Sequence, residues 1–439
     1  MTRVRAIGGR TFDALRSRDY RLYFTGQVVS LSGTWMQTVA QSWLVIELTG
    51  SGALLGAVVA VQFLPLLLLG PVAGAVADRV DKRRFLLLTQ TVAGTAALVL
   101  GLLVLTGGIE LWMVFAAAGV LGVANAFDVP ARQALVVELV GPERLPNALA
   151  LNGLVLSSAK VVGPTLAGIV IGTLGVAACF LLNAASYLAC LAALVAMHVR
   201  PLPADGSGRG RRRTSGRRDG GGLATIWRAP ELRTPLVVLA VIGTITYEFQ
   251  VTLPLLARFT FGAGAEGYAL LLAAMSTGAV VGGLVAAATN RGSHRRLGFA
   301  GLALGTVTLL LAAAPSMAVA LAVLPFVGMA SALFLAGSNA TVQAVVPHAL
   351  RGRVMALYAM ALLGTTPIGG PIAGLLGERF GPRAAIAIGG LAAVVTVAVA
   401  WRALDRAERG HAADDDEPLA PVVALRPTAD DEVEVRLAG

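Results

Sequence analysis

The sequence predicts an all-α integral membrane protein whose twelve transmembrane helices form two pseudo-symmetric six-helix bundles. Three observations lead to this fold class: an apolar composition, a regular series of long apolar segments, and an internal repeat. Of the 439 residues, 56% are hydrophobic and only 14% are charged, whereas soluble domains carry about 25% charged residues. The mean hydropathy of +0.75 is typical of a chain that lies mostly in lipid.

Each predicted helix corresponds to one apolar segment, because a helix needs about 20 mostly apolar residues to cross a bilayer. Six segments form the first half: 22–47, 52–77, 85–106, 111–128, 149–172 and 176–198. Six form the second half: 234–258, 267–289, 297–314, 317–342, 353–377 and 383–402. No segment remains that would form a water-soluble domain.

The two halves repeat each other in sequence. Gln37 in "TWMQTV" aligns with Gln250 in "YEFQVT", "DRVDKRR" (78–84) aligns with "NRGSHRR" (290–296), and "GPTLAG" (163–168) aligns with "GPIAG" (370–374). Since each half has an even number of helices, both insert in the same orientation. A parallel repeat of this kind is typical of transporters, with the substrate site between the halves near the midplane.

The two bundles and the segments that flank them divide the chain into five parts. Residues 1–21 form an amino-terminal segment, and 22–198 and 234–402 form the two bundles. Residues 199–233 form a linker rich in Gly, Ser and Arg, and 403–439 form an acidic tail. We expect the linker and the tail to be disordered, because they contain too little apolar surface to offset the entropy of ordering.

The basic residues predict the orientation. All but four of the 35 lie in the terminal segments and in the loops on one side; the exceptions are Lys160, Arg258, Arg379 and Arg383. Positively charged loops stay in the cytoplasm, so we expect both termini there. The net charge of +10 follows from these loops and needs no nucleic acid to explain it.

One cytoplasmic loop carries an unusual cluster of charge, "GAVADRVDKRR". Gly74 allows a tight turn, and Asp78 can cap a neighbouring helix amino terminus. Arg79, Lys82 and Arg83 can anchor to phosphates or carboxylates. We interpret the loop as a conformational latch that holds one half against the other. The alternative, a topology signal, accounts for the arginines but not for the aspartate or the glycine.

Polar side chains form a stripe along the first helix, at spacings of three and four residues that place them on one face. The stripe comprises Gln27, Ser30, Thr34, Gln37 and Gln41. We interpret it as a wall of the substrate cavity, together with Gln250 and Ser338. Small polar residues also join helices to one another, and this alternative remains open.

Ionisable residues deep in a bilayer are costly and usually functional. Lys160 and Glu248 lie near the middle of their spans. We expect Glu248 to carry a proton, and Lys160 to act as its counter-charge or as a contact for a substrate anion. Asp128, nearer a span end where it can reach headgroups or water, is the next candidate for proton coupling. A structural contact between helices is the alternative for each.

The motif in 74–84 resembles the signature of the loop between helices 2 and 3 in the major facilitator superfamily, with Asp81 where that signature has glycine. "DVPARQALVVELVGPERLPNALALN" and "KVVGPTLAG" resemble the bacterial branch that contains the enterobactin exporter and drug-efflux permeases. The resemblance covers 19–402 and implies the major facilitator fold. Gly163, Pro164 and Gly168, with Lys160, match the family's helix-5 motif loosely, since "AG" replaces "GG".

The resemblance implies a secondary active transporter that exports drugs, siderophores or secondary metabolites by alternating access as a proton antiporter. A lipid or lysophospholipid translocator is the alternative. A membrane-embedded transferase is disfavoured, because the external loops are short, and a channel lacks recognisable filter elements. We expect no enzyme activity, metal or cofactor, with the proton gradient as energy source. The expected partners are a small-molecule substrate and membrane lipids, with no nucleic acid, and the expected state is a monomer in the bacterial cytoplasmic membrane.

Overall fold

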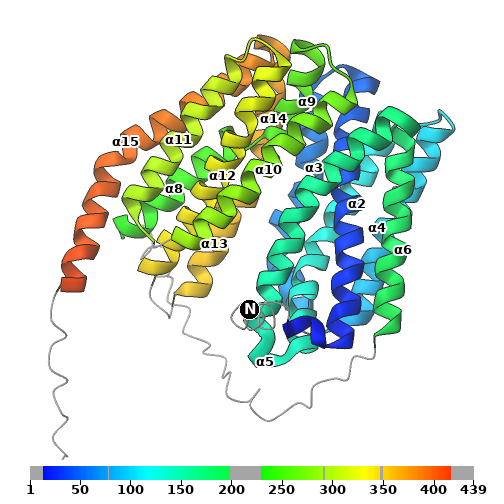
Figure 1. Ribbon diagram of the computed structural model, residues 1–439, viewed down its shortest axis with the longest axis horizontal. Helices are drawn as coiled ribbons and strands as arrows, with labels where there is room; N and C mark the ends of the chain where they lie inside the picture. Colours follow the sequence, from blue (N-terminus) through cyan, green and yellow to red (C-terminus); the bar gives the residue numbers. More distant parts are fainter. Residues whose placement is uncertain (1–12, 78, 198–228, 290–291, 347–349, 417–439) are drawn as a thin grey trace, which may run out of the picture.

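The computed structural model describes residues 13–77, 79–197, 229–289, 292–346 and 350–416, and within these ranges every regular element is helical. Figure 1 shows two bundles side by side. The all-helical architecture with membrane-length helices confirms the predicted fold class. In the described part of the chain, eleven helical segments are long and apolar enough to cross a membrane, and α2, at 32 residues, is long enough but more polar.

The first bundle contains a short 3-10 helix, η1 (Asp13–Arg16), followed by longer helices. These are α2 (Arg18–Thr49), α3 (Gly52–Ala77), α4 (Lys82–Leu105), α5 (Leu111–Leu174) and α6 (Val176–Ala196). Two predicted spans share α5, which bends at Gly141, where φ is 72°. Only glycine adopts this conformation readily.

The second bundle contains more interruptions. Its elements are α8 (Pro230–Ile245), α9 (Phe249–Leu255), a π-helical turn η3 (Leu256–Thr260), α10 (Ala265–Thr289), α11 (His294–Ala312), α12 (Met317–Val345), α13 (Arg351–Leu363), α14 (Thr366–Phe380) and α15 (Pro382–Asp416). The seventh span therefore breaks between α8 and α9, and the eleventh between α13 and α14.

Side-chain caps define several helix starts. The Asp81 carboxylate accepts a hydrogen bond from Arg84 N at 3.0 Å, and Ser293 Oγ accepts one from Arg296 N at 3.2 Å. Such caps satisfy amide groups that have no partner inside the helix. Asp81, which departs from the family signature, is thus the residue that starts α4.

The predicted start of the disordered tail, residue 403, lies inside a helix. Helix α15 continues to Asp416, and its extension packs on α11: Asp405 pairs with Arg295 at 2.7 Å, and Glu408 accepts a hydrogen bond from His294 N at 2.7 Å. Charged contacts add to the burial of Leu404 and Ala407 here, which the polar composition of the tail did not indicate. Residues 417–439 and most of the linker, 198–228, lie outside the described residues.

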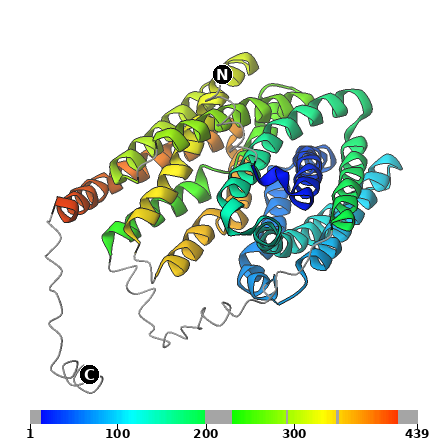
Figure 2. The same ribbon diagram turned by 60° about the horizontal axis from the view of Figure 1, so that its bottom comes forward.

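We call the end of the molecule where α6 finishes and α8 starts the linker end, and the opposite end the distal end. The two bundles converge at the distal end and diverge toward the linker end (Figures 1 and 2). Their main contacts join α3 to α14 and α5 to α10. The molecule is therefore closed between the halves at the distal end.

Candidate functional site

The distal closure rests on glycines in two facing helices. A Cβ on Gly52 of α3 would lie 2.7 Å from Gly374 O of α14, and one on Gly370 would lie 3.1 Å from Gly56 O. Absence of side chains lets helix backbones approach this closely. We call the contact of Gly52 and Gly56 with Gly370 and Gly374 the distal seal.

Polar contacts reinforce the distal seal. The Glu378 carboxylate of α14 accepts hydrogen bonds from Ser51 Oγ at 2.6 Å and from Ala53 N at 3.0 Å, so one half caps a helix of the other. Nearby, the Arg258 guanidinium of η3 lies 6.0 Å from the ring centroid of Trp43 in α2. Sequence reasoning assigned Glu378 no role.

Glu248 lies directly behind this seal. It occupies the break between α8 and α9, and only 3% of its surface is exposed. A Cβ on Gly370, which would touch Gly56, would also lie 3.7 Å from Glu248 Oε2. Among the described residues, Glu248 Oε1 has no hydrogen-bond partner. Glu248 is thus a buried, unpaired carboxyl group beside the contact between the halves.

Lys160 and Glu248 do not pair in this conformation. The ion pairs of the described ranges include neither residue. Lys160 Nζ lies instead 5.3 Å from the ring centroid of Trp35 in α2. The expected counter-charge role therefore has no support in this conformation.

The helix-5 motif positions α5 against two neighbours. A Cβ on Gly163 would lie 2.8 Å from Ser32 O of α2, in the same half. A Cβ on Gly168 would lie 3.2 Å from Ala269 Cβ of α10, in the other half. Helix α5 passes through Pro164 without a break, and its one non-helical residue is Gly141.

The first bundle contains a buried ionic cluster that sequence reasoning missed. Asp128 is 3% exposed and forms an ion pair with Arg132 one turn away. Asp128 Oδ1 also accepts hydrogen bonds from Gln90 Nε2 at 2.7 Å and from Thr89 Oγ1 at 3.1 Å, and Arg132 donates to Gln27 Oε1 at 2.9 Å. The cluster borders a cavity of about 30 Å³.

This cluster corrects two expectations. Asp128 does not reach headgroups or water, and Arg132 is not a loop cation, because α5 continues past the expected end of the fourth span and carries both into the bundle. The signal was present in the sequence as an acid and a base at i and i+4 on a helix.

The predicted cavity wall on α2 stays a prediction, and most of its members are buried in this conformation. Gln27, Ser30, Gln37 and Gln41 are each at most 5% exposed. Gln37 Oε1 accepts from Asn183 Nδ2 of α6 at 2.6 Å, and Gln41 donates to Gln62 of α3 at 3.1 Å. In this conformation Gln37 and Gln41 join helices within one half, whereas Gln27 and Ser30 border the small polar cavity beside Asp128.

The remaining members of that prediction differ in environment. Thr34 is half-buried, with its hydroxyl 3.4 Å from Tyr187 Oη. Ser338 is fully buried, so it cannot line an open cavity in this conformation. Gln250 is half-buried in α9.

The latch residues contact their own half. Lys82 pairs with Glu138 at 3.1 Å, and Arg83 donates to the carbonyls of Leu194 and Val195 at 2.7 Å each. Gly74 lies inside α3 rather than in a turn, with open space around it, and Arg79 is exposed. Asp78 lies outside the described residues.

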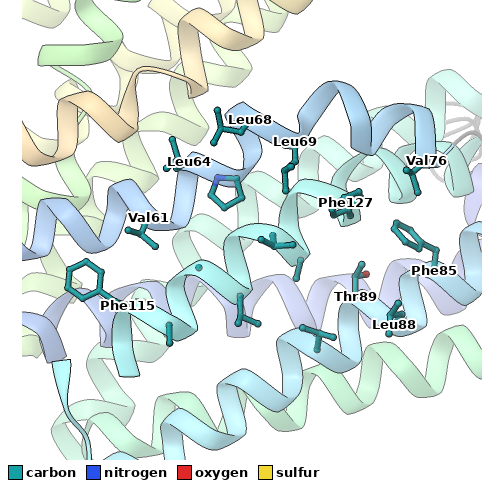
Figure 3. A pocket seen from close by; sticks show the side chains of 17 residues that line it. Val61, Leu64, Leu68, Leu69, Val76, Phe85, Leu88, Thr89, Phe115 and Phe127 are labelled. Carbon is teal, nitrogen blue, oxygen red and sulfur yellow. The ribbon is translucent and has the colours of Figure 1, made fainter. Parts of the chain in front are cut away.

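An apolar groove of about 970 Å³ lies in the first bundle, between α3, α4 and α5. Figure 3 shows side chains from all three helices along it, including Leu64, Leu68, Leu88 and Phe127. Thr89, a hydrogen-bond partner of Asp128, lines both this groove and the small polar cavity.

These features define a multi-pass membrane transporter of two six-helix halves. Residues 10–428 match the family described as "Transmembrane secretion effector", within the major facilitator superfamily, and the chain belongs to this family. The family and the relatives are transporters rather than enzymes.

Two relatives illustrate the family. The multidrug efflux pump Tap of Mycolicibacterium fortuitum is 26% identical over 358 residues, which cover 80% of this chain and 87% of the pump. The staphyloferrin A transporter of Staphylococcus aureus is 25% identical over 190 residues, which cover 43% of this chain and 48% of that protein.

Solved structures share the fold at low identity. A bacterial homologue of the human lysosomal transporter Spinster, described as inward-facing and unoccupied, has a TM-score of 0.69 and 15% identity, and the match covers 92% of this chain and 99% of that one. The nucleoside transporter NupG has a TM-score of 0.70 and 11% identity, with 88% and 98% covered.

Proposed function

We propose that this protein exports small amphipathic molecules, such as drugs, siderophores or secondary metabolites, from the cytoplasm in exchange for protons. The distal seal carries the proposal, because contact between the halves at one end and divergence at the other is one of the two states that alternating access requires. With the termini in the cytoplasm, this state opens inward.

Glu248 is the proposed proton carrier. An ionised carboxylate without a donor is costly to bury, which favours its protonated form while the seal is closed. Opening of the seal between Gly56 and Gly370 hydrates the carboxyl group and lets the proton exchange. Asp128 is the weaker candidate, since it already forms an ion pair with Arg132.

The relatives' names support efflux of drugs and siderophores as the substrate range. The apolar groove of Figure 3 favours one second candidate, a lipid or lysophospholipid translocator.

Proteoliposomes with an imposed pH gradient separate these functions. We expect uphill accumulation of ethidium or a siderophore that a protonophore abolishes. Movement of a labelled lysophospholipid without movement of the drug panel would support the translocator. If the pH gradient drives the movement of none of these probes, the proposal is refuted.

A further inference from the structure

Lys160 projects from α5 toward the space between the halves. In an α-helix successive residues turn by about 100°, so Gly163 lies about 60° to one side of Lys160 and Gly168 about 80° to the other. Gly163 packs on α2 and Gly168 packs on α10. Lys160 therefore lies in the sector between these two helices, and lipid meets the opposite side of α5.

The depth of Lys160 is set by the same helix. It lies near the middle of the span Glu143–Leu174. Gly168, where α5 meets the other half, is eight residues further toward the distal end, or about 12 Å along the axis. The amine thus lies below the closure, on the side that opens toward the linker end. The Lys160 side chain is exposed in this conformation.

The Lys160 ammonium group has unused binding capacity. Among the described residues it has neither a carboxylate partner nor a hydrogen-bond acceptor, and its one recorded contact is the half-buried Trp35 ring. A lysine carries three N–H donors, and an aromatic face stabilises a solvent-exposed cation only weakly. Burying an unpaired cation at this depth costs free energy, which indicates that a ligand pairs with the Lys160 ammonium group.

We propose that Lys160 and Trp35 form the recognition site for an anionic amphiphile, so that the exported substrates carry a carboxylate, sulfonate or phosphate group beside an apolar ring or chain. Lys160 binds the anionic group, and the Trp35 ring packs on the apolar part. Lys160 acts as a specificity-determining residue, and this inference deepens the function proposed above by naming a substrate class.

Two probes with the same aromatic skeleton test this site. 8-Anilinonaphthalene-1-sulfonate carries a sulfonate, and N-phenyl-1-naphthylamine does not. Binding of each is measured by fluorescence to the purified protein in nanodiscs, with empty nanodiscs subtracted. Lys160→Gln removes the charge, Lys160→Arg keeps it, and Lys82→Gln is the matched control, because Lys82 is the only other lysine of the chain and pairs with Glu138.

We expect Lys160→Gln to weaken sulfonate-probe binding about tenfold, equivalent to about 1.4 kcal/mol, and to leave neutral-probe binding within about twofold. Lys160→Arg should bind the sulfonate probe like the wild type, as should Lys82→Gln. Unchanged sulfonate binding in Lys160→Gln, or equal loss of both probes, would overturn the inference. Gradient-driven export is measured separately, and absence of transport in the wild type would refute the antiporter proposal. The equilibrium affinities test the anion site independently of that result.

Discussion

The Glu378 carboxylate of one half caps the first turn of α3 in the other half, through Ser51 Oγ at 2.6 Å and Ala53 N at 3.0 Å. A capping acceptor with charge at a helix amino terminus contributes about 0.5–2 kcal/mol. This contact exists only while the halves meet at the distal end, so its whole contribution favours the closed distal state.

Glu378→Ala should therefore shift the protein toward the distally open state by about twofold to thirtyfold, since 1.4 kcal/mol is a factor of ten. Spin labels at the distal ends of the two halves would report the distance distribution. Glu110→Gln is the control, because Glu110 bonds Trp112 within its own half. An identical shift in both variants would contradict the capping role.

Gly56→Ala should also open the distal seal, because the added Cβ would collide with the Gly370 backbone. Gly70→Ala is a matched control on the same helix, where a Cβ meets no atom within 4 Å. Both changes raise helix propensity similarly, so any difference in the label distances comes from the seal. Equal behaviour of the two variants would show that the seal tolerates a methyl group.

Asp128→Asn should lower the melting temperature, because it leaves Arg132 buried without its counter-ion, a loss of about 3–5 kcal/mol. The double variant with Arg132→Gln should lose less than the sum of the single changes. Asp405→Asn, which disrupts exposed ion pairs with Arg295 and Arg409, should lower the melting temperature much less. Strict additivity of the Asp128 and Arg132 changes would disprove the coupling.

Glu248→Gln should abolish proton-driven uphill efflux, because the amide cannot release a proton, while substrate affinity changes little. Counterflow, which needs no net proton movement, should persist in the same proteoliposomes. If the variant still concentrates substrate on a pH gradient, the proton is carried elsewhere.

Cysteines near Glu110 and Glu266, at the distal end, should react with an impermeant maleimide added outside intact cells. A cysteine at Arg83, at the linker end, should react only after lysis. The asymmetric distribution of basic residues predicts this result. Labelling at Arg83 from outside would reverse the orientation and with it the direction of the opening.

The number, order and parallel arrangement of the spans could be predicted from the sequence alone. Hydropathy is a local property, and backbone groups in lipid must bond within their own helix, so each apolar segment such as 52–77 predicts one helix without knowledge of its neighbours. The breaks at Glu248 and before Thr366 could not be located this way, because the spans containing them remain apolar on average despite a few polar residues.

Which side chains meet was decided by the tertiary structure. A polar stripe such as Gln27, Gln37 and Gln41 has the same spacing whether it lines a cavity or joins helices, and only the positions of α6 and α3 show that Gln37 and Gln41 join helices. Asp128 became a buried ion pair because α5 continues beyond its apolar segment. The sequence determines which helices form, since that depends on local burial and bonding, whereas rotation and depth of each helix depend on packing between residues far apart in the chain.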